Sequence, residues 1–165
     1  MQFEFAREFL KRCKSYFMHT VIETCGHVPW EHLAGVLDYV DLVFYDIKHM
    51  DPFKHRELAG VSNDLILRNA RHLLSGYGEK TIVRVPIIPT LNDSEENVKS
   101  IANFVLESGG KMMELLPYHQ LGRSKYRQLG RKYELEDLKP PSRERMQKLR
   151  RLVSSLGANE VSGAI

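Results

Sequence analysis

The chain has 165 residues, of which 42% are hydrophobic and 27% charged, and its formal net charge is +3. This is the composition of an ordinary soluble domain, long enough to bury a core of its own. So small a net charge does not indicate a nucleic-acid partner, and no zinc-finger spacing or aromatic-rich RNA-binding motif is visible. The basic residues between Lys111 and Arg151 are interpreted as a solvated helical face and a basic loop.

The two cysteines, Cys13 and Cys25, are too few for a disulfide framework, so a reducing, cytoplasmic location is expected. Residues 1–8 lack the basic and apolar stretches of a signal peptide, and no apolar run reaches the length of a membrane span. Cys25 is interpreted as a small loop residue, because no second cysteine lies near it in the sequence.

Helix-like and strand-like patterns alternate along the chain. Apolar residues that recur every three or four positions indicate helices, and short β-branched runs bounded by turn residues indicate strands. In chain order, the sequence predicts a helix over residues 3–16, a strand over 17–22, a helix over 29–39, a strand over 40–45, helices over 52–58 and 62–74, a strand over 81–88, a long helix between Asn92 and Gly109, a strand over 112–116, a loop with Gly122, Gly130, Pro140 and Pro141, and a last helix from Met146 to Leu156.

Several helix starts carry capping residues. Pro29 suits the first turn of its helix, and Ser62 can cap the helix that follows it. Either Asn92 or Asp93 is predicted to cap the long helix, whose first turn carries the acidic residues that the helix dipole favours.

Four strands separated by helices predict an α/β fold with a parallel sheet and right-handed crossovers. Four parallel strands do not close a barrel, so we expect a partial (β/α) barrel with outer helices, in one domain over residues 1–157 with a tail at 158–165. The tail is expected to be loose or a short edge strand. Residues 18–23 form the exposed edge, whose free backbone groups favour self-association unless the first helix folds across them.

Polar clusters follow the predicted strands. Since the carboxyl ends of parallel strands meet at one end of a sheet, the side chains there are expected to line one concave face. The residues predicted on this face are Glu23, Asp46, Lys48, Arg84 and His119.

Each of these charged or titratable residues allows a structural and a functional interpretation. Asp46 and Lys48 are two residues apart and share a face, so they form either a structural ion pair or a site for an anionic group. Arg84 needs a bidentate partner such as a carboxylate or a ribose, and Glu23 is a candidate partner without a ligand. His119 is either a loop-capping residue or a ligand-binding one, since a lone histidine decides nothing.

Taken together, these clusters resemble the C-terminal part of glycyl-radical enzyme activating enzymes, radical S-adenosylmethionine enzymes typified by pyruvate formate-lyase activating enzyme. The resemblance extends from about Phe5 to Gly157 and rests on motifs that are weak alone and specific in this order. These motifs are Glu23–Gly26, Tyr45–Asp51, Leu58–Asn63, Arg84–Pro89, Asn92–Ser94 and Leu115–Gly122.

The resemblance implies roles for individual residues. Lys48 matches the lysine that binds the methionine carboxylate of S-adenosylmethionine. Glu23, Thr24 and Asp46 match a group that holds a monovalent cation beside that carboxylate, with Glu23 standing where the typical member has Asp. Arg84 and His119 match residues of the cofactor pocket, the histidine near the nucleoside.

The chain also departs from the family. The resemblance implies a 4Fe-4S cluster held by a C-x3-C-x2-C motif, and the sequence contains neither this motif nor the Gly-Gly-Glu-Pro turn for the cofactor's amino group. We therefore expect a barrel without its first two β/α units: a truncated gene product, a shortened chain, or a misassigned start at an internal methionine. Such a chain would carry no catalytic residue, bind no cluster, bind S-adenosylmethionine weakly or undetectably so that none is expected bound, and be inactive alone.

The activity that the resemblance implies for the full-length protein is reductive cleavage of S-adenosylmethionine, which generates a radical on a glycine of a partner enzyme. The alternative is a non-catalytic protein that keeps the partner-docking surface of the family. A third hypothesis, a metal hydrolase using His119, Asp46 and Glu23, has no convincing ligand set. No nucleic-acid or membrane partner is expected.

Overall fold

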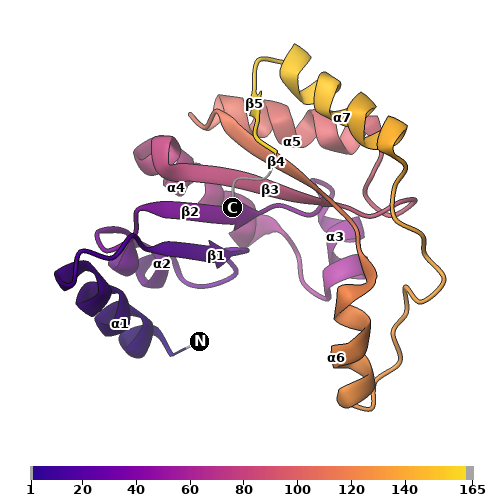
Figure 1. Cartoon of the computed structure of the whole chain (residues 1–165). Coiled ribbons are helices and arrows are strands. Elements are labelled where there is room, and N and C mark those ends of the chain that lie inside the picture. The colour runs from indigo at the N-terminus through magenta and orange to yellow at the C-terminus, as the bar shows by residue number, and fades with distance from the viewer. Residues whose placement is uncertain (1, 163–165) are drawn as a thin grey trace.

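The computed structural model describes residues 2–162 and contains one five-stranded parallel sheet with helices around it (Figure 1). Helices and strands alternate, as the sequence pattern predicts. In chain order the elements are α1 (Phe3–Ser15), β1 (Val21–Thr24), α2 (Trp30–Leu37), β2 (Leu42–Asp46), α3 (Pro52–Ala59), α4 (Asp64–Tyr77), η1 (Gly78–Lys80), β3 (Thr81–Ile87), α5 (Glu95–Glu107), β4 (Met112–Pro117), η2 (Gln120–Gly122), α6 (Arg123–Gln128), α7 (Arg143–Ser155) and β5 (Asn159–Glu160).

The strands lie in the order β1-β2-β3-β4-β5, all parallel, and the sheet does not close. This confirms the predicted partial (β/α) barrel, with one short strand more than the four predicted. The added strand, β5, pairs with the start of β4 and lies in the predicted tail. Residues 163–165 of that tail lie outside the described residues, and the division into a domain and a tail stays a prediction.

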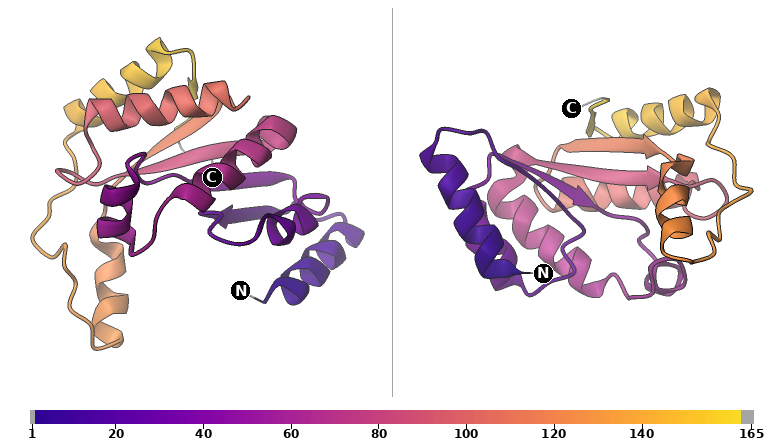
Figure 2. Two further views of the ribbon diagram at one scale, coloured as in Figure 1. Left: turned by 180° about the vertical axis from the view of Figure 1, so that it is seen from behind. Right: turned by 60° about the horizontal axis from the view of Figure 1, so that its bottom comes forward.

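One face of the sheet carries the core. Its side chains, among them Tyr45, Val83, Val85 and Leu115, are at most 1% exposed. Helices α2, α4 and α5 lie on this side (Figure 2), and α7 packs against α5 and β4. Because strand side chains alternate between the two faces, the residues between these core positions point to the face that these helices leave uncovered.

The strand predicted over residues 17–22 begins later, at Val21. Phe17 adopts a left-handed backbone conformation with φ 58°, so the chain turns after α1 rather than extending. Thr20 then anchors the turn, since its Oγ1 donates to the carbonyl oxygen of Tyr39 at 2.6 Å and its backbone N–H donates to Asp41 at 2.8 Å. The prediction of strand structure at residues 17–20 is therefore wrong.

Two predicted caps are also wrong. Ser94 caps α5, with its Oγ accepting from the backbone N–H of Asn97 at 3.1 Å, whereas Asn92 lies in the preceding loop. Asn63 occupies the cap position of α4, and Ser62 Oγ instead donates to Asp64 Oδ2 at 2.6 Å. Local sequence permits several caps, and the tertiary contacts of the loops decide between them.

Helix α1 lies beside the sheet edge at β1, where Phe3, Ala6 and Leu10 line a small cavity together with side chains of β1. Helix α1 packs against α2, where Phe3 stacks on His32 with ring centroids 4.6 Å apart. Phe5 and Phe9 stack on each other and stay exposed, at 66% and 57%. The helix therefore buries only one of its two apolar stripes.

Candidate functional site

A row of charged side chains crosses the uncovered face of the sheet. In the strand register, Glu23 pairs with Phe44 and Arg84 pairs with Glu114, so these side chains share one face. Arg84 Nε donates to Glu114 Oε2 at 2.7 Å, and Arg84 Nη1 donates to Glu23 Oε2 at 3.2 Å. The guanidinium thus bridges carboxylates from β1 and β4, and Glu23 is its partner, as the sequence suggests.

Arg84 is held tightly. Its guanidinium carbon lies 3.6 Å from the ring centroid of Phe44, a cation–π contact, and its side chain is only 11% exposed. Glu114 is more deeply buried, at 6%, while Glu23 is 63% exposed. Burying a charged pair in a sheet is costly even when it is paired, so this row is a weak source of stability.

The second charged group, Asp46 and Lys48, lies at the carboxyl end of β2. Asp46 pairs in register with Arg84, and its Oδ2 accepts from Lys48 Nζ at 3.0 Å. The lysine side chain is 36% exposed and can exchange partners, whereas Asp46 Oδ1 is buried with no hydrogen-bond partner among the described residues. An unsatisfied buried carboxylate oxygen beside an accessible ammonium suits a ligand with a cationic or hydroxyl group near an anionic one.

Buried asparagines fix the loops that carry these charges. Asn92 Nδ2 donates to the carbonyl oxygens of Lys48 and Pro86 at 2.8 and 2.6 Å, which joins the ends of β2 and β3. Asn97 Oδ1 accepts from the backbone N–H of Met50 at 3.0 Å. The backbone around Lys48 is therefore pre-organised from two sides.

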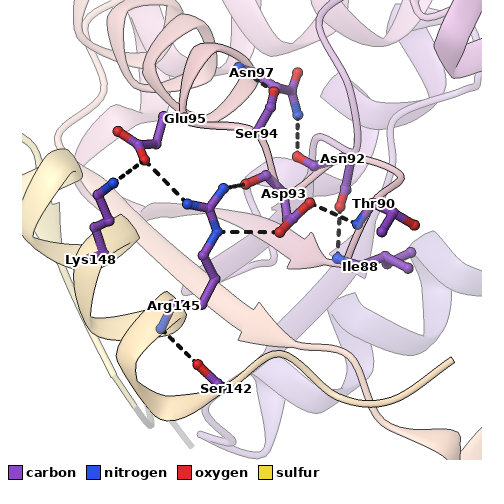
Figure 3. Close-up of polar contacts among 10 residues, drawn as sticks. All are labelled: Ile88, Thr90, Asn92, Asp93, Ser94, Glu95, Asn97, Ser142, Arg145 and Lys148. Atoms are coloured by element: carbon purple, nitrogen blue, oxygen red, sulfur yellow. Dashed lines mark hydrogen bonds and ion pairs between the residues drawn. The ribbon is translucent and has the colours of Figure 1, made fainter.

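Helix α7 clamps the loop between β3 and α5 (Figure 3). Arg145 contacts Asp93 through its Nε at 3.3 Å and through a short hydrogen bond from Nη2 to the Asp93 carbonyl, and it contacts Glu95 at 3.2 Å. Lys148 Nζ lies 2.6 Å from Glu95 Oε1. These cations, Lys148 above all, lower the pKa of Glu95.

Thr24 lies on the other side of β1. It pairs in register with Tyr45, on the helix-covered face, and its Oγ1 accepts from the backbone N–H of Gly26 at 3.0 Å. Gly26 has φ 67°, and a Cβ there would lie 1.9 Å from the Tyr45 hydroxyl. The turn after β1 therefore requires glycine, and the Thr24 side chain belongs to that turn rather than to the charged row.

His119 makes a local contact after β4. It is exposed and caps η2, where its Nδ1 accepts from the backbone N–H of Leu121 at 3.3 Å. Its neighbour Tyr118 is buried. The structure brings Glu23 together with Arg84 and Asp46 together with Lys48, and among the described residues no hydrogen bond or ion pair joins Thr24 or His119 to them.

Sequence reasoning missed Glu114, the most buried member of the row. The signal was present, because Glu114 interrupts the apolar strand Met112–Leu116 as Arg84 interrupts its own. It also missed the role of the buried asparagines, since Asn92 was predicted only as a candidate helix cap and Asn97 lies within α5.

No group of three or more His, Cys, Asp or Glu side chains within residues 2–162 is placed to hold a metal ion. Cys13 lies on α1 and Cys25 follows β1, so the two thiols do not fit an iron–sulfur cluster, which needs thiolates gathered around it. None of the helices in the described part combines the length and hydropathy that crossing a membrane requires.

No known protein-family model matches the chain, but curated proteins do. It is 38% identical over 154 residues to the indoleacetate decarboxylase activating enzyme of Tractidigestivibacter scatoligenes, covering 93% of this chain and 49% of the relative. It is 43% identical over 138 residues to the 4-hydroxyphenylacetate decarboxylase activating enzyme of Clostridioides difficile, covering 83% and 44%. The chain thus spans about half the length of these relatives.

Solved structures agree. The fold matches a crystallised domain of pyruvate-formate lyase-activating enzyme from Bacteroides vulgatus with a TM-score of 0.80 and 26% identity, over 98% of this chain and 91% of that one. A radical SAM methyltransferase from Sphaerobacter thermophilus, 15% identical with a TM-score of 0.67 over 89% of this chain and 41% of that one, shares the fold. These likenesses confirm the resemblance that the motifs suggested, and the chain belongs to the family of glycyl-radical enzyme activating enzymes.

Proposed function

We propose that the uncovered face of the sheet forms one side of an S-adenosylmethionine pocket, in a protein that activates a glycyl-radical enzyme. The observation that carries this proposal is the accessible Lys48 ammonium beside the unsatisfied buried oxygen of Asp46, at the carboxyl end of an open parallel sheet. Cofactor-dependent barrels bind their ligands at this end.

The donor set fits the amino-acid end of this cofactor. Lys48 would bind the methionine carboxylate after leaving Asp46, and the freed Asp46 would accept a hydrogen bond from a positively charged or hydroxyl group. Arg84, with its carboxylate partners, would hold the floor of the pocket. Glu23, Thr24 and Asp46 stay candidates for a monovalent cation, although the Thr24 side chain points to the covered face and only its backbone could contribute there.

The residues of this chain do not fit an iron–sulfur cluster, so the proposal involves no step through one. When S-adenosylmethionine is bound and cleaved in the complete activating enzyme, it supplies the radical that abstracts hydrogen from a glycine. We propose that this chain supplies binding and orientation, is inactive alone, and acts in the cytoplasm on a glycyl-radical enzyme. The relatives that support this partner class are named as activating enzymes of decarboxylases and dehydratases.

Nuclear magnetic resonance titration of the whole chain with S-adenosylmethionine tests the proposal. We expect weak, saturable shifts at Asp46, Lys48 and Arg84, because the open sheet contacts a ligand from one side. 5′-Methylthioadenosine, which lacks the amino-acid group, should leave the Asp46–Lys48 signals unshifted.

Lys48→Ala should remove the shifts that depend on the carboxylate, and Lys54→Ala, at an exposed lysine on the neighbouring α3, serves as the matched control. Shifts elsewhere in the chain, or shifts indifferent to Lys48→Ala, would contradict the proposed pocket. A micromolar dissociation constant for S-adenosylmethionine would contradict a pocket that contacts the cofactor from one side only.

The non-catalytic alternative stays open, because the same chain could serve only to bind the partner. In a protein of that kind, S-adenosylmethionine would shift no resonances of residues at the strand ends. The protein would still bind the glycyl-radical enzyme.

A further inference from the structure

The segment between β4 and α7 forms an arm, here defined as residues 118–139, which the sequence predicted only as a loop. It contains η2 and α6, and α6 projects from the carboxyl end of β4 away from the sheet (Figure 1). The missed helix α6 is short, and Gly130, in the left-handed conformation with φ 63°, turns the chain back after it.

The base of the arm is cross-linked. The hydroxyls of Tyr118 and Tyr133 lie 2.8 Å apart, and Tyr118 also donates to the Leu135 carbonyl oxygen at 3.1 Å. Gln120 Nε2 donates to the carbonyl oxygens of Glu136 and Leu138 at 3.0 and 3.1 Å. Desolvation, followed by the hydrogen bond to Tyr118, raises the pKa of Tyr133 to about 12. The outgoing and returning segments of the arm are thus joined near the sheet. These contacts hold the tip of the arm, residues 121–133, in a defined shape.

The tip carries a local excess of positive charge, and the acidic residues of the arm, Glu134, Glu136 and Asp137, follow it. Residues 121–133 contain five basic side chains and no acidic one, while the full chain has a net charge of +3, so the remainder carries 3 − 5 = −2. Four of the five lie at exposed positions, and the fifth, Arg123, is half-buried. A local excess of one sign on a projecting element attracts a partner of the opposite sign.

A small cavity of about 160 Å³ opens between α6 and the returning chain. It is lined by Arg123, Arg127, Arg131, Lys132, Tyr133 and Glu136. Glu136 pairs with Arg123, and Glu134 pairs with Lys132 at 3.2 Å. Arg127 and Arg131 have no carboxylate partner among the described residues, so two guanidinium groups face one concavity unneutralised. A carboxylate is the group that such a fork binds best.

Apolar side chains stand beside this cavity. Leu121 and Leu129 are 77% and 67% exposed, and Tyr126 is 42% exposed. Exposed leucine and tyrosine among arginines are the composition of a protein-binding surface. Nucleic acid is a poorer fit, because Tyr126 and Tyr133 pack against each other edge to face at 5.0 Å rather than standing as a row of separate rings on which successive bases could stack.

We infer that the arm is a docking surface for an acidic segment of a partner protein. A carboxylate side chain of the partner enters the cavity between Arg127 and Arg131, and a neighbouring apolar side chain covers Leu121 and Leu129. This inference goes beyond the proposed cofactor pocket and does not depend on it, since no residue of the arm tip belongs to the charged row.

Fluorescence anisotropy with a labelled synthetic peptide of alternating glutamate and leucine tests the inference. The whole chain should bind this peptide saturably, and more weakly as salt rises. The same peptide with glutamine for glutamate should not bind, because it lacks the carboxylates. Arg127→Gln and Arg131→Gln should each weaken binding about tenfold, as expected for loss of one close charge pair at an interface.

Matched variants keep the test decisive. Lys99→Gln removes the same charge from an exposed position on α5 and should change binding by less than about twofold. Arg127→Lys keeps the charge and should restore most of the affinity. Lys48→Ala should leave peptide binding unchanged, which separates this inference from the cofactor pocket.

Three results would overturn the inference: no saturable binding of the glutamate peptide, equal losses with Lys99→Gln and Arg127→Gln, or tighter binding of a single-stranded RNA through the same arginines. Peptide-induced resonance shifts confined to residues outside the arm would also overturn it.

Discussion

The two faces of the sheet differ in what they contribute. On the helix-covered face, Tyr45, Val83 and Leu115 are at most 1% exposed and surrounded by apolar side chains, so they drive folding. On the other face, Arg84 and Glu114 place nearly buried charges in the middle of the same strands.

The two faces therefore differ in how much they contribute to the stability of the fold. A sheet that only needed to fold would place apolar residues at both sets of positions, because replacing a buried ion pair by apolar side chains is often neutral or stabilising. The charges on the uncovered face, and the unsatisfied oxygen of Asp46, are consistent with the cofactor pocket proposed above.

The largest expected effect separates the two faces on one strand. Leu115→Ala should destabilise the protein by about 2–5 kcal/mol, since it opens a cavity under the helices. Leu116→Ala, at the half-buried adjacent position on the other face, should cost clearly less. Urea denaturation monitored by circular dichroism measures both, and equal losses would show that the faces are not different.

A smaller effect is expected from the charged row. Arg84→Met should cost about 3 kcal/mol, because it removes one ion-pair partner of the buried Glu114 carboxylate. The double variant Arg84→Met with Glu114→Leu should recover part of that loss, since no buried charge is then left behind. Strictly additive losses in a double-mutant cycle would contradict this coupling.

A third prediction concerns a carboxylate that serves folding only. Asp41 accepts from Lys14 Nζ at 2.7 Å and from the backbone N–H of Thr20 at 2.8 Å, and these contacts, Lys14 first, hold its pKa far below the usual range. A carboxylate with a lowered folded-state pKa stabilises the protein fully above its unfolded pKa, about 3.9, and loses this stabilisation as the pH falls further.

Asp41→Asn should therefore be less stable than the wild type at neutral pH, and the difference should shrink below about pH 4. Lys14→Gln should reduce the same acid dependence in part. Chemical denaturation across this pH range provides the measurement, and a pH-independent difference between Asp41→Asn and the wild type would argue against the ion pair.

The smallest effect on stability is expected at the sheet edge formed by β1. Strand β1 ends the sheet, and Phe17, Met18 and Val21 beside it are 98%, 56% and 41% exposed. We expect the chain to form dimers or larger species through this edge. Val21→Lys should shift light scattering toward the monomer, whereas Phe53→Lys, at an equally apolar but distant exposed site on α3, should not.

A wild-type chain that scatters as a monomer at micromolar concentration would refute this self-association. It would indicate that α1 and the turn at Phe17 suffice to protect the edge.

The sequence by itself determined the alternation of helices and strands, the parallel sheet and the family, because periodicity and motif order are local properties. It also indicated that Arg84, in an otherwise apolar strand, needs a bidentate partner such as a carboxylate or a ribose, and Glu23, the candidate without a ligand, does contact it. The stripe of α5, from Val98 to Val105, is buried as its spacing predicted.

Only the tertiary structure decided which groups meet. Glu114 becomes the main partner of Arg84 through the register of β3 and β4, which no local pattern specifies. Thr24 turns to the covered face because strand alternation places it opposite Glu23, and Ser94 caps α5 because the side chains of Asn92 and Asp93 are committed to the preceding loop. Spacing along the chain fixes periodicity, whereas pairing across the sheet depends on how distant strands align, and that alignment is set by packing of the whole core.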